Sequence, residues 1–201
     1  MTPMRLPADT VLIVIDVQEA IDDPRWGPRN NPQAEANIAA LIAAWRAEDL
    51  PIVHVRHDSV DPASPYAPDG PGHRFKPCAA PLPGEAVLAK NANSAFVGTA
   101  LEEMLDDLGA TTLVVCGVLT PNSVEATARH AGNLGRHRFV VEDVCLGARQ
   151  DLRGRHWPAE DVHALSLAHL EGEYASIVSA MTTLRAAALA KSRQRRGAGK
   201  A

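Results

Sequence analysis

Three polar residues stand just beyond short apolar segments, the position at which open parallel sheets place their ligands. Asp16 closes the apolar run 11–15, Lys90 follows AVLA at 86–89, and Ser123 comes shortly after TTLVVCGV at 111–118. A carboxylate at the end of an apolar run is partly desolvated, which raises its pKa unless a cation keeps it charged, and Lys90 is the obvious cation. Because buried Asp–Lys pairs add little stability, this pair fits a functional role at least as well as a purely structural one.

Ser123 allows two interpretations from the residues alone. It could be a nucleophile, although no histidine base stands near it in the sequence. It could equally cap the helix expected at 123–134, because serine is a preferred N-cap residue. The following residues, VEA, do not complete a strict capping box, since Ala126 and not glutamate stands three places on.

The elements that must position these residues alternate along the chain. Apolar and β-branched runs predict strands at 11–17, 51–55, 86–89, 111–118, 138–144 and 174–178. Helical spacing predicts helices at 32–50, 98–108, 123–134, 158–170 and 179–190. This alternation predicts an α/β fold: one three-layer αβα domain with a doubly wound, mainly parallel sheet of about six strands.

The length of 201 residues and the composition are those of a single globular domain with a sizeable core. We expect the domain to cover 1–190, with a basic tail at 191–201 that is disordered. The net charge of -4 argues against a nucleic-acid surface, and the apolar run at 11–15 is too short to span a membrane. Three cysteines without a CxxC pair suggest neither disulfides nor a zinc ribbon, so we expect a cytoplasmic protein.

One segment interrupts the alternation. Residues 58–85 contain seven prolines and several glycines, which disfavour regular structure. A loop of this length in a compact domain is usually an active-site lid, a binding loop or an oligomer contact. The sequence therefore predicts a functional loop next to the strand that ends near residue 55.

Three motifs, in order, carry a resemblance to a known family. They are VLIVIDVQ with Asp16 and Gln18, AKNANSAFVGTALEEML with Lys90, and LVVCGVLTPNSVEATARHAGNLG with Ser123. Together the motifs span nearly the whole chain, which resembles the isochorismatase-like superfamily of cysteine hydrolases. This superfamily includes nicotinamidases, N-carbamoylsarcosine amidases and isochorismatases. The third motif departs from the family form at one place, because Ser123 stands where the family has its nucleophilic cysteine.

The resemblance implies a covalent mechanism without a cofactor. In the family, cysteine attacks a carboxamide or related carbon, aspartate transfers protons, and lysine holds the aspartate charged. Carried over, these roles fall on Ser123, Asp16 and Lys90, with the backbone N–H groups of Leu119 and Ser123 as the oxyanion hole. The family also implies a cis peptide bond between Val118 and Leu119, and a homo-oligomer, dimeric or tetrameric.

We therefore expect a hydrolase for a small amide or carbamoyl C–N bond. A serine hydroxyl ionises far less readily than a thiol, so this Cys→Ser form should turn over little substrate by the covalent route. Two alternatives remain open. The chain could use non-covalent chemistry with Asp16 as the general acid, or it could be a non-catalytic binding protein on the same scaffold.

The substrate pocket is less well specified. Candidate contacts are Gln18, Trp26, Arg56, His57 and Phe96. No metal is expected, because His57, Asp58 and the distant His73 do not reproduce the Asp-x-His spacing of the metal-binding nicotinamidases. Three cysteines remain, Cys78, Cys116 and Cys145, and none is expected to be the nucleophile; free cysteine is commonly a small buried apolar residue.

Overall fold

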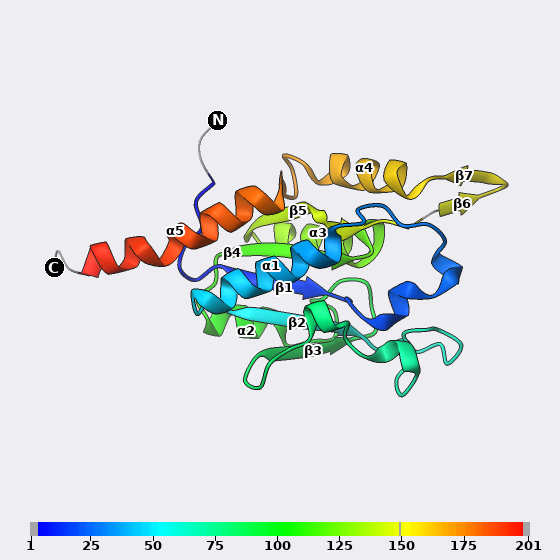
Figure 1. Cartoon of the computed structure of the whole chain (residues 1–201), viewed down its shortest axis with the longest axis horizontal. Helices are drawn as coiled ribbons and strands as arrows, with labels where there is room; N and C mark the ends of the chain where they lie inside the picture. The colour runs from blue at the N-terminus through cyan, green and yellow to red at the C-terminus, as the bar shows by residue number, and fades with distance from the viewer. Residues whose placement is uncertain (1–3, 149, 199–201) are drawn as a thin grey trace.

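The computed structural model describes residues 4–148 and 150–198, and it has the predicted three-layer α/β architecture (Figure 1). Six strands form the central sheet in the order β3-β2-β1-β4-β5-β8, and every neighbouring pair is parallel. These strands are β1 (Val11–Ile15), β2 (Ile52–His57), β3 (Ala86–Lys90), β4 (Thr112–Val118), β5 (His137–Leu146) and β8 (Ser176–Val178). The predicted doubly wound sheet is confirmed.

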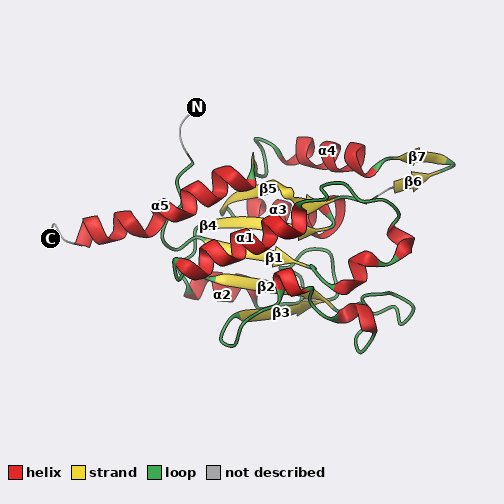
Figure 2. Cartoon of the chain, in the orientation of Figure 1, coloured by secondary structure: helices red, strands yellow, loops and turns green. Residues whose placement is uncertain are grey.

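Helices cover both faces of this sheet (Figure 2). The helices are α1 (Ala34–Ala47), α2 (Leu101–Asp107), α3 (Glu125–Asn133), α4 (Ala159–Leu170) and α5 (Ala180–Ala198). One apolar core joins α1 and α5 to the sheet, and the other joins α2, α3 and α4 to the opposite face. Among the described residues, no helix is long and apolar enough to cross a bilayer.

The central strand β1 explains why the sequence folds in this way. Its five residues are all buried, and they alternate between the two cores. Leu12 and Val14 pack toward α1 and α5, whereas Val11, Ile13 and Ile15 pack toward α2 and α3. A strand that is apolar on both sides is the pattern expected for the middle of a parallel sheet.

Two details differ from the predicted elements. A short antiparallel hairpin of β6 (Gln150–Leu152) and β7 (Arg155–Trp157) lies between β5 and α4, where no strand was predicted. The last helix α5 ends at Ala198, beyond the predicted end at residue 190. The disorder expected for 191–201 stays a prediction, and residues 199–201 lie outside the described residues.

Candidate active site

Asp16 lies directly after β1 and turns out of the strand. Its φ is 53°, in the left-handed region that aspartate tolerates better than most residues but that still costs on the order of 1 kcal/mol. The backbone N–H of Asp16 donates to the carbonyl of Val55, so the turn remains attached to β2. The carboxyl group is almost completely buried, as the sequence predicted from the apolar run before it.

Strand β4 comes unusually close to β1 at the same end of the sheet. Gly117 has a φ of 127°, and a Cβ atom at this position would lie 2.1 Å from the carbonyl oxygen of Ile15. Only glycine fits this approach. The Val118–Leu119 peptide bond follows directly after this close contact and is cis, as the family resemblance implied.

Ser123 follows this bond within a π-helical turn, Thr120–Val124, that runs directly into α3. The prediction that Ser123 caps the helix is wrong, because the turn begins earlier and no side-chain capping bond is made at its start or at the start of α3. The Ser123 hydroxyl instead faces the other two residues of the predicted triad. Turns of π-helix occur frequently at functional sites.

Lys90 joins the site from the end of β3. Its ammonium group donates to Asp16 Oδ2 at 2.7 Å and to Ser123 Oγ at 3.2 Å. A third contact, at 3.3 Å, reaches His57 Nδ1. The Lys90 side chain is fully buried, so these bonds form away from bulk solvent. The structure thus brings together all three residues that the sequence singled out for chemistry.

The electrostatics of this cluster follow from its burial. Burial raises the pKa of Asp16, while the Lys90 charge and, more weakly, Ser123 and His57 oppose the rise. Asp16 Oδ1 is buried and has no hydrogen-bond partner among the described residues. Burial also lowers the pKa of His57, so this imidazole is neutral near pH 7. The site therefore holds a carboxyl group that can exchange a proton beside a neutral histidine.

A small cavity of about 120 Å³ opens above the cluster. Its predicted lining residues are Asp16, Trp26, His57, Leu119 and Ser123. The sequence did not single out the remaining five: Ser64, Tyr66, Asn93, Val118 and Asn122. Ser64 and Tyr66 come from the proline-rich loop, which is the part of the chain predicted to be functional, but its composition does not indicate which residue turns inward.

Trp26 and Tyr66 form the aromatic wall of this cavity. Their ring centroids are 6.1 Å apart in an edge-on arrangement, and Tyr66 packs edge-on against His57 at 5.7 Å. The Trp26 indole donates to the carbonyl of Ala20 at 2.8 Å, which fixes the orientation of its ring. The cavity thus presents a rigid apolar side opposite the polar cluster.

Three of the predicted pocket residues lie elsewhere. Phe96 packs in the core with α2 and α3 and lies against His130, with 5.0 Å between the ring centroids. The Arg56 guanidinium pairs with Asp58 at 2.9 Å. Gln18 is fully buried and bonds backbone groups of β2 and the proline-rich loop. These side chains support the site from outside the cavity, so their predicted contact with substrate is not what the geometry indicates.

The described residues hold no group of three His, Cys, Asp or Glu side chains arranged for a metal ion. His73 bonds Asp58 at 2.7 Å, whereas His57 faces Lys90, so the suggested metal ligands are divided between two places. Cys116 and Cys145 are buried in the two cores, and burial raises the pKa of the Cys145 thiol to about 12. Neither thiol is placed to act as a nucleophile in the cavity.

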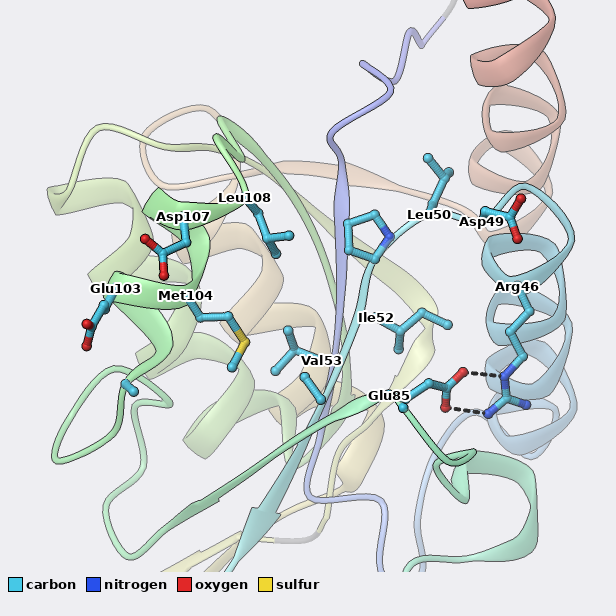
Figure 3. Close-up of a pocket in the computed structure, with 14 residues that line it drawn as sticks. Arg46, Asp49, Leu50, Ile52, Val53, Glu85, Glu103, Met104, Asp107 and Leu108 are labelled. Carbon is cyan, nitrogen blue, oxygen red and sulfur yellow. Dashed lines mark hydrogen bonds and ion pairs between the residues drawn. The ribbon is translucent and has the colours of Figure 1, made fainter.

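A larger cavity of about 730 Å³ lies at the opposite end of the sheet (Figure 3). Its floor is apolar and comes from the start of β2 and from α2, including Ile52, Val53 and Met104. Glu103 and Asp107 stand at its rim, and Arg46 and Glu85 pair with each other along one side. This larger cavity lies at the amino ends of the strands and is lined by no Ser, Thr, Cys or Lys side chain. The smaller cavity is therefore the candidate active site.

The fold and this site define a hydrolase-type α/β domain with an Asp–Lys pair at the carboxyl ends of parallel strands. The isochorismatase domain family matches residues 10–181. The chain is 37% identical over 169 residues to the isochorismatase family protein YrdC of Bacillus subtilis, covering 84% of this chain and 90% of the relative. The chain therefore belongs to the isochorismatase family.

A solved structure and a relative with a named activity agree with this assignment. An isochorismatase-family protein from Chromobacterium violaceum has a TM-score of 0.90 and 51% sequence identity, covering 94% of this chain and 99% of that one. Ureidoacrylate amidohydrolase RutB of Methylobacterium radiotolerans is 30% identical over 202 residues, covering 82% of this chain and 74% of the relative. Members of the family are hydrolases, and this chain is a hydrolase of that family.

Proposed function

We propose that this hydrolase cleaves a small amide or carbamoyl C–N bond, with residue 123 as the nucleophile position and Asp16 and Lys90 as its partners. The observation that carries the proposal is the buried contact of Lys90 with both Asp16 Oδ2 and Ser123 Oγ, at 2.7 and 3.2 Å, beneath the cavity. The amidohydrolase activity of the relative RutB supports the choice of an amide bond.

In this mechanism the nucleophile attacks the carbonyl carbon as its proton passes to Asp16. The oxyanion that forms would be bound by the backbone N–H groups of Leu119 and Ser123, two residues that line the cavity. The C–N bond then breaks, the leaving nitrogen receives a proton, and water hydrolyses the acyl intermediate. The cavity of about 120 Å³ fits a small reacting group, and the walls at Trp26 and Tyr66 suit a planar or apolar one.

Ser123 is a weak nucleophile in this arrangement, because a hydroxyl ionises far less readily than a thiol beside the same Lys90. We therefore expect that the chain behaves as a Cys→Ser form of a cysteine hydrolase and that a sulfur atom at position 123 would raise turnover. Support for this comes from the surrounding groups, which are all in place around Ser123.

The test is the Ser123→Cys variant, assayed on simple amides, carbamoyl compounds, nicotinamide and isochorismate. We expect amide or carbamoyl hydrolysis to appear or to increase at least tenfold, and to disappear in the Ser123→Cys/Asp16→Asn double variant. A Ser123→Cys protein that hydrolyses none of these compounds would overturn the assignment of the triad. In that case the non-catalytic binding protein would be favoured.

A second candidate is non-covalent hydrolysis with Asp16 as the general acid. It is favoured by one observation: burial raises the pKa of Asp16, and its Oδ1 atom lacks a partner among the described residues. A carboxyl group in that state can hold and deliver a proton. Activity of the Ser123 chain itself that requires Asp16 and is unchanged in Ser123→Ala would favour this route. The predicted homo-oligomer and cytoplasmic location stay predictions.

A further inference from the structure

Lys90 meets three acceptors with its three N–H bonds. They are Asp16 Oδ2, Ser123 Oγ and His57 Nδ1, at 2.7, 3.2 and 3.3 Å. An ammonium group can only donate, so Nδ1 of His57 must carry a lone pair. The neutral His57 ring therefore carries its hydrogen on Nε2, on the other side of the ring from Lys90.

His57 is also held rigidly at the cavity. Its backbone N–H donates to Gln18 Oε1 at 2.8 Å, its carbonyl accepts from Gln18 Nε2 at 3.2 Å, and Tyr66 packs edge-on against its ring. The residue lines the cavity next to Asp16 and Ser123. One nitrogen of this neutral histidine bonds the buried Lys90, and the residue also lines the cavity. His57 is therefore arranged to pass a proton between Lys90 and a substrate in the cavity.

We propose that His57 is a further catalytic residue, which gives a proton to the leaving nitrogen and later takes one from water, exchanging it with Asp16 through Lys90. This inference rests on the proposed amide hydrolysis. It assigns the protonation of the leaving group to His57, so that Asp16 serves the nucleophile and need not reach the leaving nitrogen.

The first half-reaction balances as follows. The nucleophile forms its bond to the carbonyl carbon and its proton moves to Asp16. As the C–N bond breaks, its electron pair takes the Nε2 proton of His57, Nδ1 takes a proton from Lys90, and Lys90 takes the proton from Asp16. The amine leaves neutral, and Asp16 and Lys90 regain their charges. His57 now carries its hydrogen on Nδ1, which therefore no longer accepts a hydrogen bond from Lys90 in the acyl intermediate.

The second half-reaction reverses these transfers. Water attacks the acyl carbon while Nε2 of His57 accepts its proton, Nδ1 returns a proton to Lys90, and Lys90 passes one to Asp16. Asp16 then protonates the departing nucleophile at position 123. Every group ends in its starting state, and the histidine has changed tautomer once in each direction.

The test compares leaving groups in the Ser123→Cys protein and, where it turns over, in the Ser123 chain. The substrates are the simple amide hydrolysed fastest by Ser123→Cys and the p-nitrophenyl ester of the same acyl group. His57→Gln keeps an oxygen that can accept from Lys90 but cannot relay a proton. We expect His57→Gln to lower kcat on the amide by about 10²- to 10³-fold. Its release of nitrophenolate from the ester in the first turnover should stay within about threefold, because a nitrophenolate leaves without protonation. Hydrolysis of the acyl intermediate, which the amide and the ester share, should slow in both cases.

His73→Gln is the matched control, since His73 bonds Asp58 and does not contact Lys90 or line the cavity described above. It should leave both rates unchanged. In His57→Gln, equal losses of amide kcat and of first-turnover nitrophenolate release, or no loss of either, would overturn the role of His57 while leaving the triad intact. A Ser123→Cys protein inactive on amides and esters alike would instead overturn the proposed function, and this inference with it.

Discussion

Gln18 and the backbone of His57 are joined by two hydrogen bonds that run in opposite directions. The Gln18 amide oxygen accepts from His57 N at 2.8 Å, and its nitrogen donates to the His57 carbonyl at 3.2 Å and to the His73 carbonyl at 2.8 Å. A single buried amide thereby satisfies the backbone of the last residue of β2 and attaches the proline-rich loop to it. Gln18 thus positions His57 while remaining outside the cavity.

Replacing Gln18 by alanine should therefore damage both stability and activity. The change leaves buried backbone groups without partners, which should lower the free energy of unfolding by about 2 kcal/mol. Gln18→Glu is the informative comparison, because it can accept from His57 N but cannot donate to the two carbonyls. Urea unfolding should show Gln18→Glu to be less stable than the unsubstituted protein, and kcat in the Ser123→Cys background should be lower. If both variants were as stable and as active as their parent proteins, these hydrogen bonds of Gln18 would not be needed.

Removing the Lys90 charge should expose the cost of burying Asp16. Lys90→Met leaves a carboxylate in the interior without its cation, and breaking such a pair typically costs about 3–5 kcal/mol. The double variant Asp16→Asn/Lys90→Met removes both charges and should recover part of that loss, as measured by denaturant unfolding. A double variant less stable than the sum of the two single changes would contradict this electrostatic explanation.

The pH dependence of catalysis should report Asp16. The proposed covalent route needs Asp16 ionised to accept a proton, and burial holds its pKa above the ordinary value of 3.8. The value of kcat/KM of the Ser123→Cys protein should therefore be constant at neutral pH and fall as the pH decreases through this raised pKa. Weakening the Lys90 contact raises the Asp16 pKa further, so Lys90→Gln should move the acidic limb to higher pH. A limb that stays in place in Lys90→Gln would assign it to another group.

Much of this site could be predicted because parallel strands end at one edge. Asp16, Lys90 and Ser123 each follow a strand of the same sheet, and their meeting needs only the strand order and a long lysine side chain. His57 was placed only loosely, because the predicted second strand stopped at residue 55. Extending β2 to His57 puts this residue directly opposite Lys90 in the register, which is the signal that was missed.

Other parts of the site could not be read from local patterns. Tyr66 enters the cavity from a loop without periodicity, so nothing in its neighbourhood indicates that it turns inward. Phe96 follows Lys90 closely in the sequence, yet the chain turns it into the core with α2 and α3. The hairpin of β6 and β7 has no strand pattern in the sequence, because most of its residues are polar and exposed. Its turn contains Arg153 and Gly154, both with positive φ.

A last prediction concerns the stability of the end of the sheet that lies opposite the candidate active site. Glu85 accepts from Arg46 Nε at 2.7 Å and Nη2 at 2.8 Å (Figure 3). It also bonds His54 and the backbone N–H of Leu82. These contacts, with the Arg46 hydrogen bonds as the largest cause, lower the pKa of Glu85 from 4.5 to about 2. The carboxylate thus ties α1 to β2 and to the loop before β3.

Because the folded pKa of Glu85 lies below its unfolded value, its contribution to stability is present above pH 4.5 and is lost as the pH falls through about 2. Glu85→Gln should therefore lower the free energy of unfolding at pH 7 by roughly 2–3 kcal/mol. The difference in free energy of unfolding between Glu85→Gln and the unsubstituted protein should shrink steadily as the pH falls. Glu173→Gln, which removes the same charge from an exposed residue, is the control and should change stability by less than about 0.5 kcal/mol. A Glu85→Gln deficit that stayed constant from neutral pH down to acid would mean that packing, and not the ionised carboxylate, makes the contribution.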